Sequence, residues 1–183
     1  MKKAMLLLSA LALALMLPGA TPATALADTS TDVILTAQLM VVNPGTVTIN
    51  GNQVNTVGEI IQGVIVSAVG WEAVEGASIQ LTHSSQLTVD WATGAIIKGK
   101  GEDRIVVVQG GVPILTGETE TKMSGNIFST VYHNGEWEVE GVGPLHDTEA
   151  KGKLTASLTL TQVAPGVYTY VGTATITGKK KID

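Results

Sequence analysis

Acidic and histidine side chains around residues 133–140 form the densest group in the chain that could do chemistry. Glu136, Glu138 and Glu140 alternate along one segment, and His133 lies just before them. Alternate residues of a strand lie about 7 Å apart, a spacing that fits a pair of glycosidase carboxylates. If Asn134-Gly135 forms a hairpin turn, His133 and Glu136 face each other and could share a metal with a third ligand.

The expected faces of this hairpin argue against both kinds of site. One face carries the apolar residues Phe128, Tyr132, Trp137 and Val139. We expect that face to be buried, which leaves the three glutamates in solvent. Carboxylates in one shared environment lack the separated pKa values that acid–base catalysis requires. We therefore predict no catalytic residue, and we favour an exposed polar pair over a metal site at His133 and Glu136.

Aromatic side chains are the stronger candidates for binding, although the chain has only three Trp, three Tyr and one Phe. Trp in a small β-domain usually belongs to the core, but barrel interiors also use aromatic rings to hold apolar or sugar ligands. The predicted ligand contacts are Trp71, Tyr132, Trp137, Tyr168 and Tyr170. The chain has no cysteine, no Gly-x-Ser-x-Gly elbow and no His-Glu-x-x-His motif, so we predict no cofactor.

The elements that must position these side chains are predicted to be β-strands. In 153–162, Leu154, Ala156, Leu158 and Leu160 alternate with Ser and Thr, the period of a half-buried strand. A turn at 163–166 joins it to a second strand. Further turns are predicted at Pro44-Gly45, Asn50-Gly51, 92–94 and Gly110-Gly111. Apolar residues in 57–69 recur at helical spacing, but the glycines and β-branched residues there favour a strand.

The N-terminus has the pattern of a secretory signal. Lys2 and Lys3 precede an uncharged apolar run over 4–17, and Ala25-Leu26-Ala27 resembles a cleavage site. We predict that residues 1–27 are removed, leaving 28–183 as one domain that is extracellular, on the cell surface or periplasmic. The run is too short to span a bilayer, and cleavage would change the formal net charge from −5 to −7.

Amino-acid composition limits the kinds of partner that this protein can bind. A hydrophobic content of 44% excludes a disordered chain, and the acidic balance argues against a nucleic-acid partner. We expect no membrane span after cleavage. An outer-membrane barrel is disfavoured because the aromatics are few and the outward stripes carry Thr and Glu.

The C-terminal part resembles secreted calycin-like barrels, in particular those of the allene-oxide-cyclase-like families. The resemblance covers about residues 123–178 and depends on glycine and apolar spacing. Its motifs are Gly135-Glu136-Trp137, Gly141-Val142-Gly143, Gly152-Lys153-Leu154-Thr155-Ala156 and the closing segment 170–178. It implies a closed antiparallel barrel with a small interior and no particular reaction.

Together these observations predict an all-β protein, a single antiparallel barrel of about eight strands, with a β-sandwich as the alternative. The barrel is favoured because closure removes edge strands in an exported protein without disulfides. The predicted function is non-catalytic: the barrel binds a small apolar ligand, or the domain contacts a cell-surface partner. The alternative is an enzyme of the cyclase-like barrel or carbohydrate-active type.

Overall fold

The computed structural model describes residues 30–182, so the predicted signal peptide lies outside the described residues. Those residues form nine strands and two short 3₁₀ helices, η1 (Glu72–Val74) and η2 (Gly143–Leu145). The strands are β1 (Ser30–Asn43), β2 (Thr46–Asn50), β3 (Gln53–Val69), β4 (Ser78–Asp90), β5 (Ala95–Gln109), β6 (Val112–Asn126), β7 (Ser129–Gly141), β8 (Thr148–Ala164) and β9 (Val167–Ile182). Within 30–182, no helix has the length and apolar character to cross a membrane.

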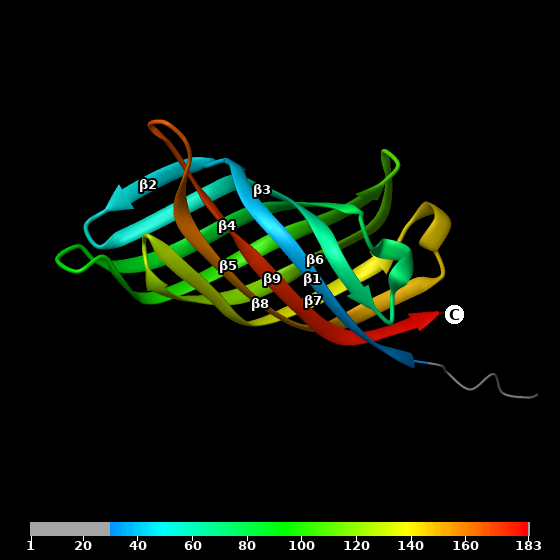
Figure 1. Ribbon diagram of the computed structural model, residues 1–183. Coiled ribbons are helices and arrows are strands. Elements are labelled where there is room, and N and C mark those ends of the chain that lie inside the picture. Colours follow the sequence, from blue (N-terminus) through cyan, green and yellow to red (C-terminus); the bar gives the residue numbers. More distant parts are fainter. Residues whose placement is uncertain (1–29, 183) are drawn as a thin grey trace, which may run out of the picture.

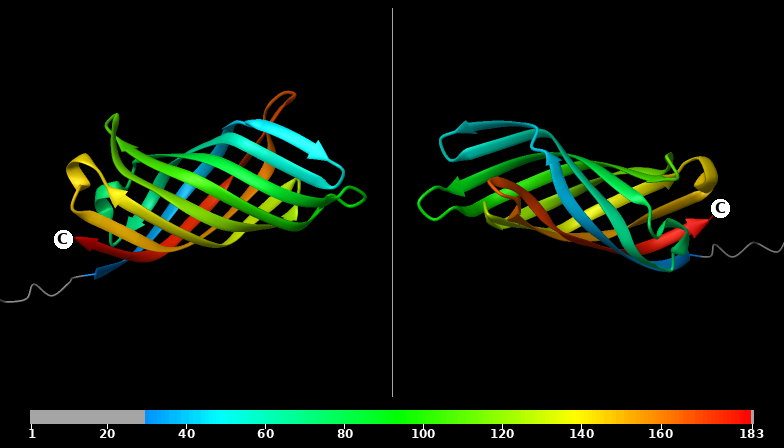
Figure 2. Two further views of the ribbon diagram at one scale, coloured as in Figure 1. Left: turned by 180° about the vertical axis from the view of Figure 1, so that it is seen from behind. Right: turned by 45° about the horizontal axis from the view of Figure 1, so that its top comes forward.

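Eight of these strands form a closed antiparallel barrel (Figure 1). Neighbours along the chain pair from β3 to β9, and β1 then pairs with both β9 and β3 to close the ring. Strand β2 pairs only with β3 and lies outside the ring (Figure 2). The predicted eight-stranded barrel is confirmed, and ring closure excludes the sandwich.

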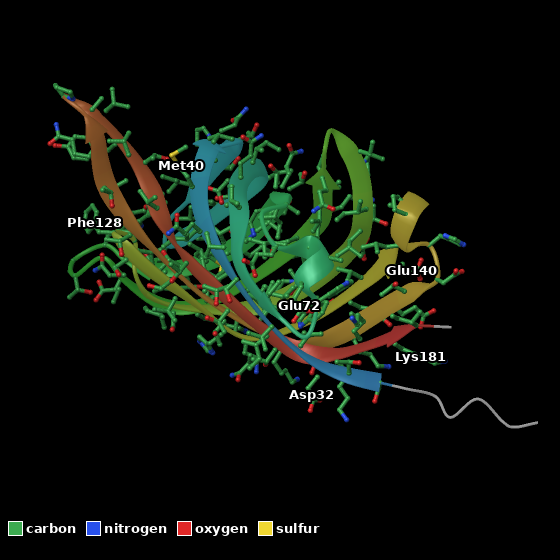
Figure 3. The ribbon with its side chains drawn as sticks, turned by 45° about the vertical axis from the view of Figure 1, so that its right-hand side comes forward. Asp32, Met40, Glu72, Phe128, Glu140 and Lys181 are labelled. Carbon is green, nitrogen blue, oxygen red and sulfur yellow. The ribbon has the colours of Figure 1, made fainter. Side chains whose placement is uncertain are left out.

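The two ends of the barrel are built differently. At the end where β3 leads into β4, η1 and its neighbours place Trp71, Val74 and Ala77 inside, each no more than 2% exposed. The opposite end carries β2 and the β4–β5 and β8–β9 hairpins (Figure 1). Phe128 lies at this second end, whereas Glu140 and Lys181 lie at the first (Figure 3). The first end is therefore filled by core side chains, and the second is the end where a cavity can form.

Alternation along the strands agrees with the sequence in most places. Leu154, Ala156 and Leu158 of β8 point into the core, and the glutamates of β7 are exposed, as predicted. Residues 57–69 belong to a strand, and the predicted turns at 44–45, 92–94 and 110–111 connect consecutive strands. The hairpin predicted at Asn50-Gly51 exists, but its turn lies one residue later, at Gly51-Asn52, because Asn50 pairs with Gln53.

The hairpin predicted at Asn134-Gly135 is wrong. Strand β7 runs through both residues, and its register with β6 and β8 shifts beside them, so the pair forms a β-bulge. Asn134 has the positive φ of +51° that made it resemble a turn residue. The true β6–β7 connection lies at Ile127-Phe128, which leaves Phe128 58% exposed rather than buried.

A second bulge lies at Gly58 in β3, where the register with β4 shifts between Val57 and Glu59. Gly58 has φ +71°, a conformation that glycine adopts without strain. The extra residue reverses the alternation along the strand. Val57 is consequently exposed on the outer surface, whereas Glu59 follows the inward series of Ile61 and Ile65.

Candidate functional site

Three ionisable side chains form a row across adjacent strands inside the barrel. The register places Glu59 of β3 opposite His83 of β4, and His83 opposite Asp103 of β5. Directly opposed residues have Cβ atoms about 5 Å apart, so such side chains interact. Both His83 and Asp103 are buried, with 1% and 8% of their surface exposed. Ionisable groups buried this deeply are rare unless paired.

His83 and Asp103 form a buried ion pair. The His83 Nδ1–H donates to the Asp103 carboxylate over 2.7 Å. Burial by itself lowers the pKa of His83, but the hydrogen bond and charge of Asp103, together with the charge of Glu59, raise it above the ordinary value of 6.5. The other ring nitrogen, Nε2, is buried with no partner among the described residues. The ring contacts Tyr132 edge-on, with centroids 5.6 Å apart.

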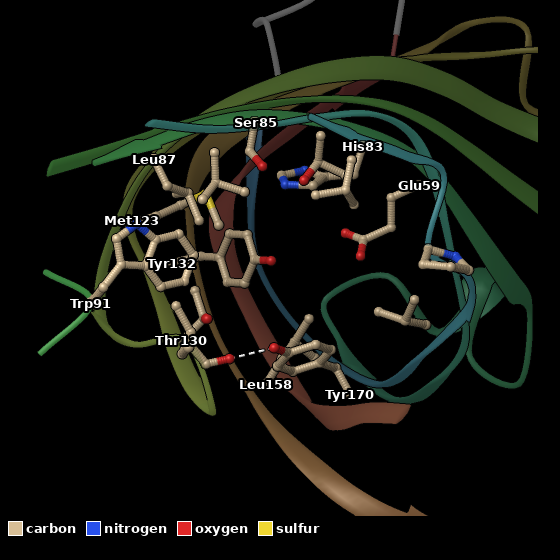
Figure 4. A pocket seen from close by; sticks show the side chains of 16 residues that line it. Glu59, His83, Ser85, Leu87, Trp91, Met123, Thr130, Tyr132, Leu158 and Tyr170 are labelled. Atoms are coloured by element: carbon tan, nitrogen blue, oxygen red, sulfur yellow. Dashed lines mark hydrogen bonds between the residues drawn. The ribbon is translucent and has the colours of Figure 1, made fainter. Parts of the chain in front are cut away.

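A cavity of about 270 Å³ occupies the β2 end of the barrel beside this row (Figure 4). Most of its lining is apolar, and the polar groups come from a few inward residues. The lining residues from the ring strands and the adjoining loops include Val41, Val54, Glu59, His83, Ser85, Leu87, Trp91, Met123, Tyr132, Leu158 and Tyr170. An apolar cavity with a few convergent polar groups is the usual form of a small-molecule site.

Two polar groups face this cavity from opposite walls. The Glu59 carboxylate points across it toward the Tyr132 hydroxyl (Figure 4). Burial raises the pKa of Glu59; the charge of His83 opposes that effect and the charge of Asp103 adds to it. Burial, followed by the charges of Glu59 and Asp103, also raises the pKa of Tyr132, which is therefore a neutral hydrogen-bond donor at physiological pH.

The five predicted ligand contacts divide into two groups. Tyr132 and Tyr170 line the cavity, and the Tyr170 hydroxyl donates to the Ile127 carbonyl. The remaining three do not line it. Trp71 fills the opposite end, the Trp137 Nε1–H donates to the Thr177 carbonyl over 3.2 Å within the core, and Tyr168 is 59% exposed on β9.

The two candidate metal ligands lie on one strand rather than across a hairpin. Glu136 is exposed and pairs with Lys153, and His133 Nδ1 lies 3.2 Å from the Asn134 side-chain amide. Within residues 30–182, no three histidine or acidic side chains converge as a metal site would require.

Alternation in the sequence carries a signal for the inward-facing residues Glu59, His83 and Asp103, which the sequence predictions missed. In 79–87, His83 and Ser85 fall on the same alternate positions as Ile79, Leu81 and Leu87. Asp103 likewise shares its phase with Ile105 and Val107. A charged side chain on the apolar phase of a strand indicates an inward-facing polar group. The same pattern holds in 59–65, where Glu59 falls on the same alternate positions as Ile61 and Ile65.

Comparison of the chain with family models, with curated proteins and with solved structures found no match in any of the three. The cavity and its side chains are therefore the features from which function is inferred.

Proposed function

We propose that this protein binds a small, largely apolar ligand within the β2 end of the barrel. The observation that supports this function is the cavity of about 270 Å³, because a largely apolar pocket with a few convergent polar groups is the usual form of a small-molecule site. The Trp91 ring stands at its mouth, where Nε1–H donates to the Gly51 carbonyl over 2.9 Å and links the β4–β5 loop to the β2–β3 turn. The polar groups at Glu59 and Tyr132 would orient the ligand.

Neighbouring residues of β4 provide a matched test. Leu87 lines the cavity, whereas Gln86 points outward and is exposed. Cyclohexylmethanol, a neutral probe, should give saturable shifts of cavity resonances in an NMR titration. Leu87→Trp should weaken this binding about tenfold or more by filling the cavity, whereas Gln86→Trp should not change it. Absence of saturable binding to the native protein by this alcohol and by its amine and carboxylate analogues would refute the function.

A second candidate function is proton transfer on a bound ligand. The observation that favours it is the unpaired Glu59 carboxylate beside the His83–Asp103 pair, since a carboxylate with a raised pKa suits a general base. The probe is 5-nitrobenzisoxazole, which opens when a base removes its C–H proton and the N–O bond breaks. Proton transfer predicts turnover that falls at least about tenfold in Glu59→Gln. Equal rates for the two proteins would remove this candidate.

We also propose that the protein acts outside the cytoplasm, on the basis of the signal pattern in residues 1–27. Expression of the full chain in a secreting host should yield a mature protein that begins at Asp28, as read by intact mass. A cytoplasmic product that retains Met1 to Ala27 would contradict this localisation.

A further inference from the structure

Glu59 brings an uncompensated negative charge into the cavity. Among the residues described as lining the cavity there is no Lys or Arg. None of the hydrogen bonds or ion pairs within 30–182 involves the Glu59 carboxylate. An ionised carboxylate without a hydrogen-bond or ion-pair partner in a largely apolar cavity is costly, because burial removes part of its hydration.

The buried pair next to Glu59 does not remove this charge. His83 in its protonated form is neutralised by Asp103 at 2.7 Å, which leaves Glu59 as the net charge of the row. His83 is 1% exposed, and its Nε2 has no partner in the described part of the chain. The row as a whole is therefore negative, or neutral only when Glu59 holds a proton.

Aromatic rings surround the same space. Tyr132, Tyr170 and Trp91 line the cavity from three different parts of the barrel. Ring faces attract cations electrostatically, and the attraction grows when water is excluded. Hydrogen bonds from Trp91 to the Gly51 carbonyl and from Tyr170 to the Ile127 carbonyl hold two of these rings in place. The cavity thus combines a carboxylate with polarisable rings.

We infer that the ligand of this cavity is an organic cation, a protonated amine on a compact apolar body, with its ammonium group paired to the Glu59 carboxylate. This inference depends on the proposed binding function and names the chemical class of the ligand. The ammonium supplies the missing counter-charge, and its apolar body displaces water from the aliphatic wall formed by Leu87 and Leu158. A carboxylate of the same shape is repelled by Glu59.

Three probes of nearly equal shape test this inference: cyclohexylmethylamine, cyclohexylmethanol and cyclohexanecarboxylate. At pH 7.5 the amine should bind at least about tenfold more tightly than the alcohol, and the carboxylate should show no saturable binding. In Glu59→Gln the preference for the amine should fall to within about twofold, because the amide keeps the shape but not the charge. Glu136→Gln is the matched control, since Glu136 lies on the outer surface paired with Lys153.

The pH dependence gives a second readout that needs no variant. Affinity for the amine should decrease as pH falls and Glu59 takes up a proton, whereas affinity for the alcohol should remain constant. The titratable groups that face Glu59 are His83, Asp103, Tyr132 and Tyr170.

The outcomes separate the two proposals. Binding of the alcohol and the amine with equal affinity, in both the native protein and Glu59→Gln, would overturn the cation inference and leave the binding function standing. Failure of all three probes to bind the native protein would overturn both.

Discussion

At the scale of single residues, Glu59 should lower the stability of the ligand-free protein. Because burial raises its pKa above the ordinary 4.5, the folded state holds this proton more tightly than the unfolded chain does. The free energy of unfolding should therefore decrease as pH rises from about 4 through the raised pKa of Glu59. Glu59→Gln should lack this decrease and be the more stable protein at neutral pH, as measured by urea denaturation at a series of pH values. If Glu59→Gln were less stable than the native protein at every pH, the prediction that ionised Glu59 destabilises the ligand-free protein would be wrong.

The His83–Asp103 pair should instead stabilise the folded protein, although its contribution also decreases as pH rises, as that of Glu59 does. A histidine whose pKa is raised on folding contributes stability that is fully present below pH 6.5 and is lost as pH rises through the folded-state pKa. Asp103→Asn should lower the free energy of unfolding by about 1–3 kcal/mol at pH 6 and lower the pKa of His83, measured by NMR titration of the ring protons.

The chain offers a matched control for that pair. His146 Nε2 lies 3.1 Å from the Asp147 carboxylate, but both side chains are exposed. Solvent screens such a pair, so Asp147→Asn should leave stability unchanged. An equal loss of stability in Asp103→Asn and Asp147→Asn would mean that burial is not what strengthens the His83–Asp103 interaction.

At the scale of elements, the bulge in β7 makes a testable prediction. Asn134 has φ +51°, which costs an ordinary side chain about 1–2 kcal/mol. Asn134→Ala should lose about 1 kcal/mol of unfolding free energy, and Asn134→Gly should lose less or gain. Gly135→Ala should be worse, because its Cβ would lie 2.8 Å from Thr121 Cγ2 and 2.9 Å from the Leu154 carbonyl oxygen. Chemical denaturation measures the unfolding free energies of the three variants. The reverse order of stability would contradict the presence of a bulge at Asn134-Gly135.

The bulge in β7 also shows what the sequence could predict and what it could not. Alternation predicted the inward faces of β8 and the outward glutamates of β7, because one face of each strand is buried. The same local signals failed at Asn134-Gly135, since a bulge and a hairpin turn both favour residues that tolerate positive φ. Only the pairing of β7 with β6 and β8 distinguishes the two, and that pairing is non-local.

At the scale of the whole molecule, composition and alternation predicted the barrel but not its site. The row of Glu59, His83 and Asp103 depends on the register of three strands, which includes the shift at Gly58. Of the aromatic residues predicted as ligand contacts, Tyr132 and Tyr170 line the cavity, whereas Trp71 fills the far end. Residue type alone does not say at which end of a barrel a ring lies. The resemblance to calycin-like barrels stays a prediction.

The separation of the two ends should be measurable. Trp71 is 2% exposed at the η1 end and packs with the core, and Lys180 Nζ lies 5.8 Å from its ring centroid. Trp71→Ala should lower the free energy of unfolding by about 3–5 kcal/mol, because it leaves a large void. The affinity of the folded protein for cyclohexylmethanol should stay within about twofold, since distant sites act independently.

Leu158→Ala is the contrasting variant, because Leu158 is equally buried but lines the cavity at the β2 end. Its loss should lower the free energy of unfolding by about 2–5 kcal/mol and should also change affinity, because the cavity grows and an apolar contact with the ligand disappears. Denaturation and NMR titration of the two variants measure both quantities. If Trp71→Ala altered affinity as strongly as Leu158→Ala, the η1 end would be energetically coupled to the cavity. The two ends of the barrel would then not be independent.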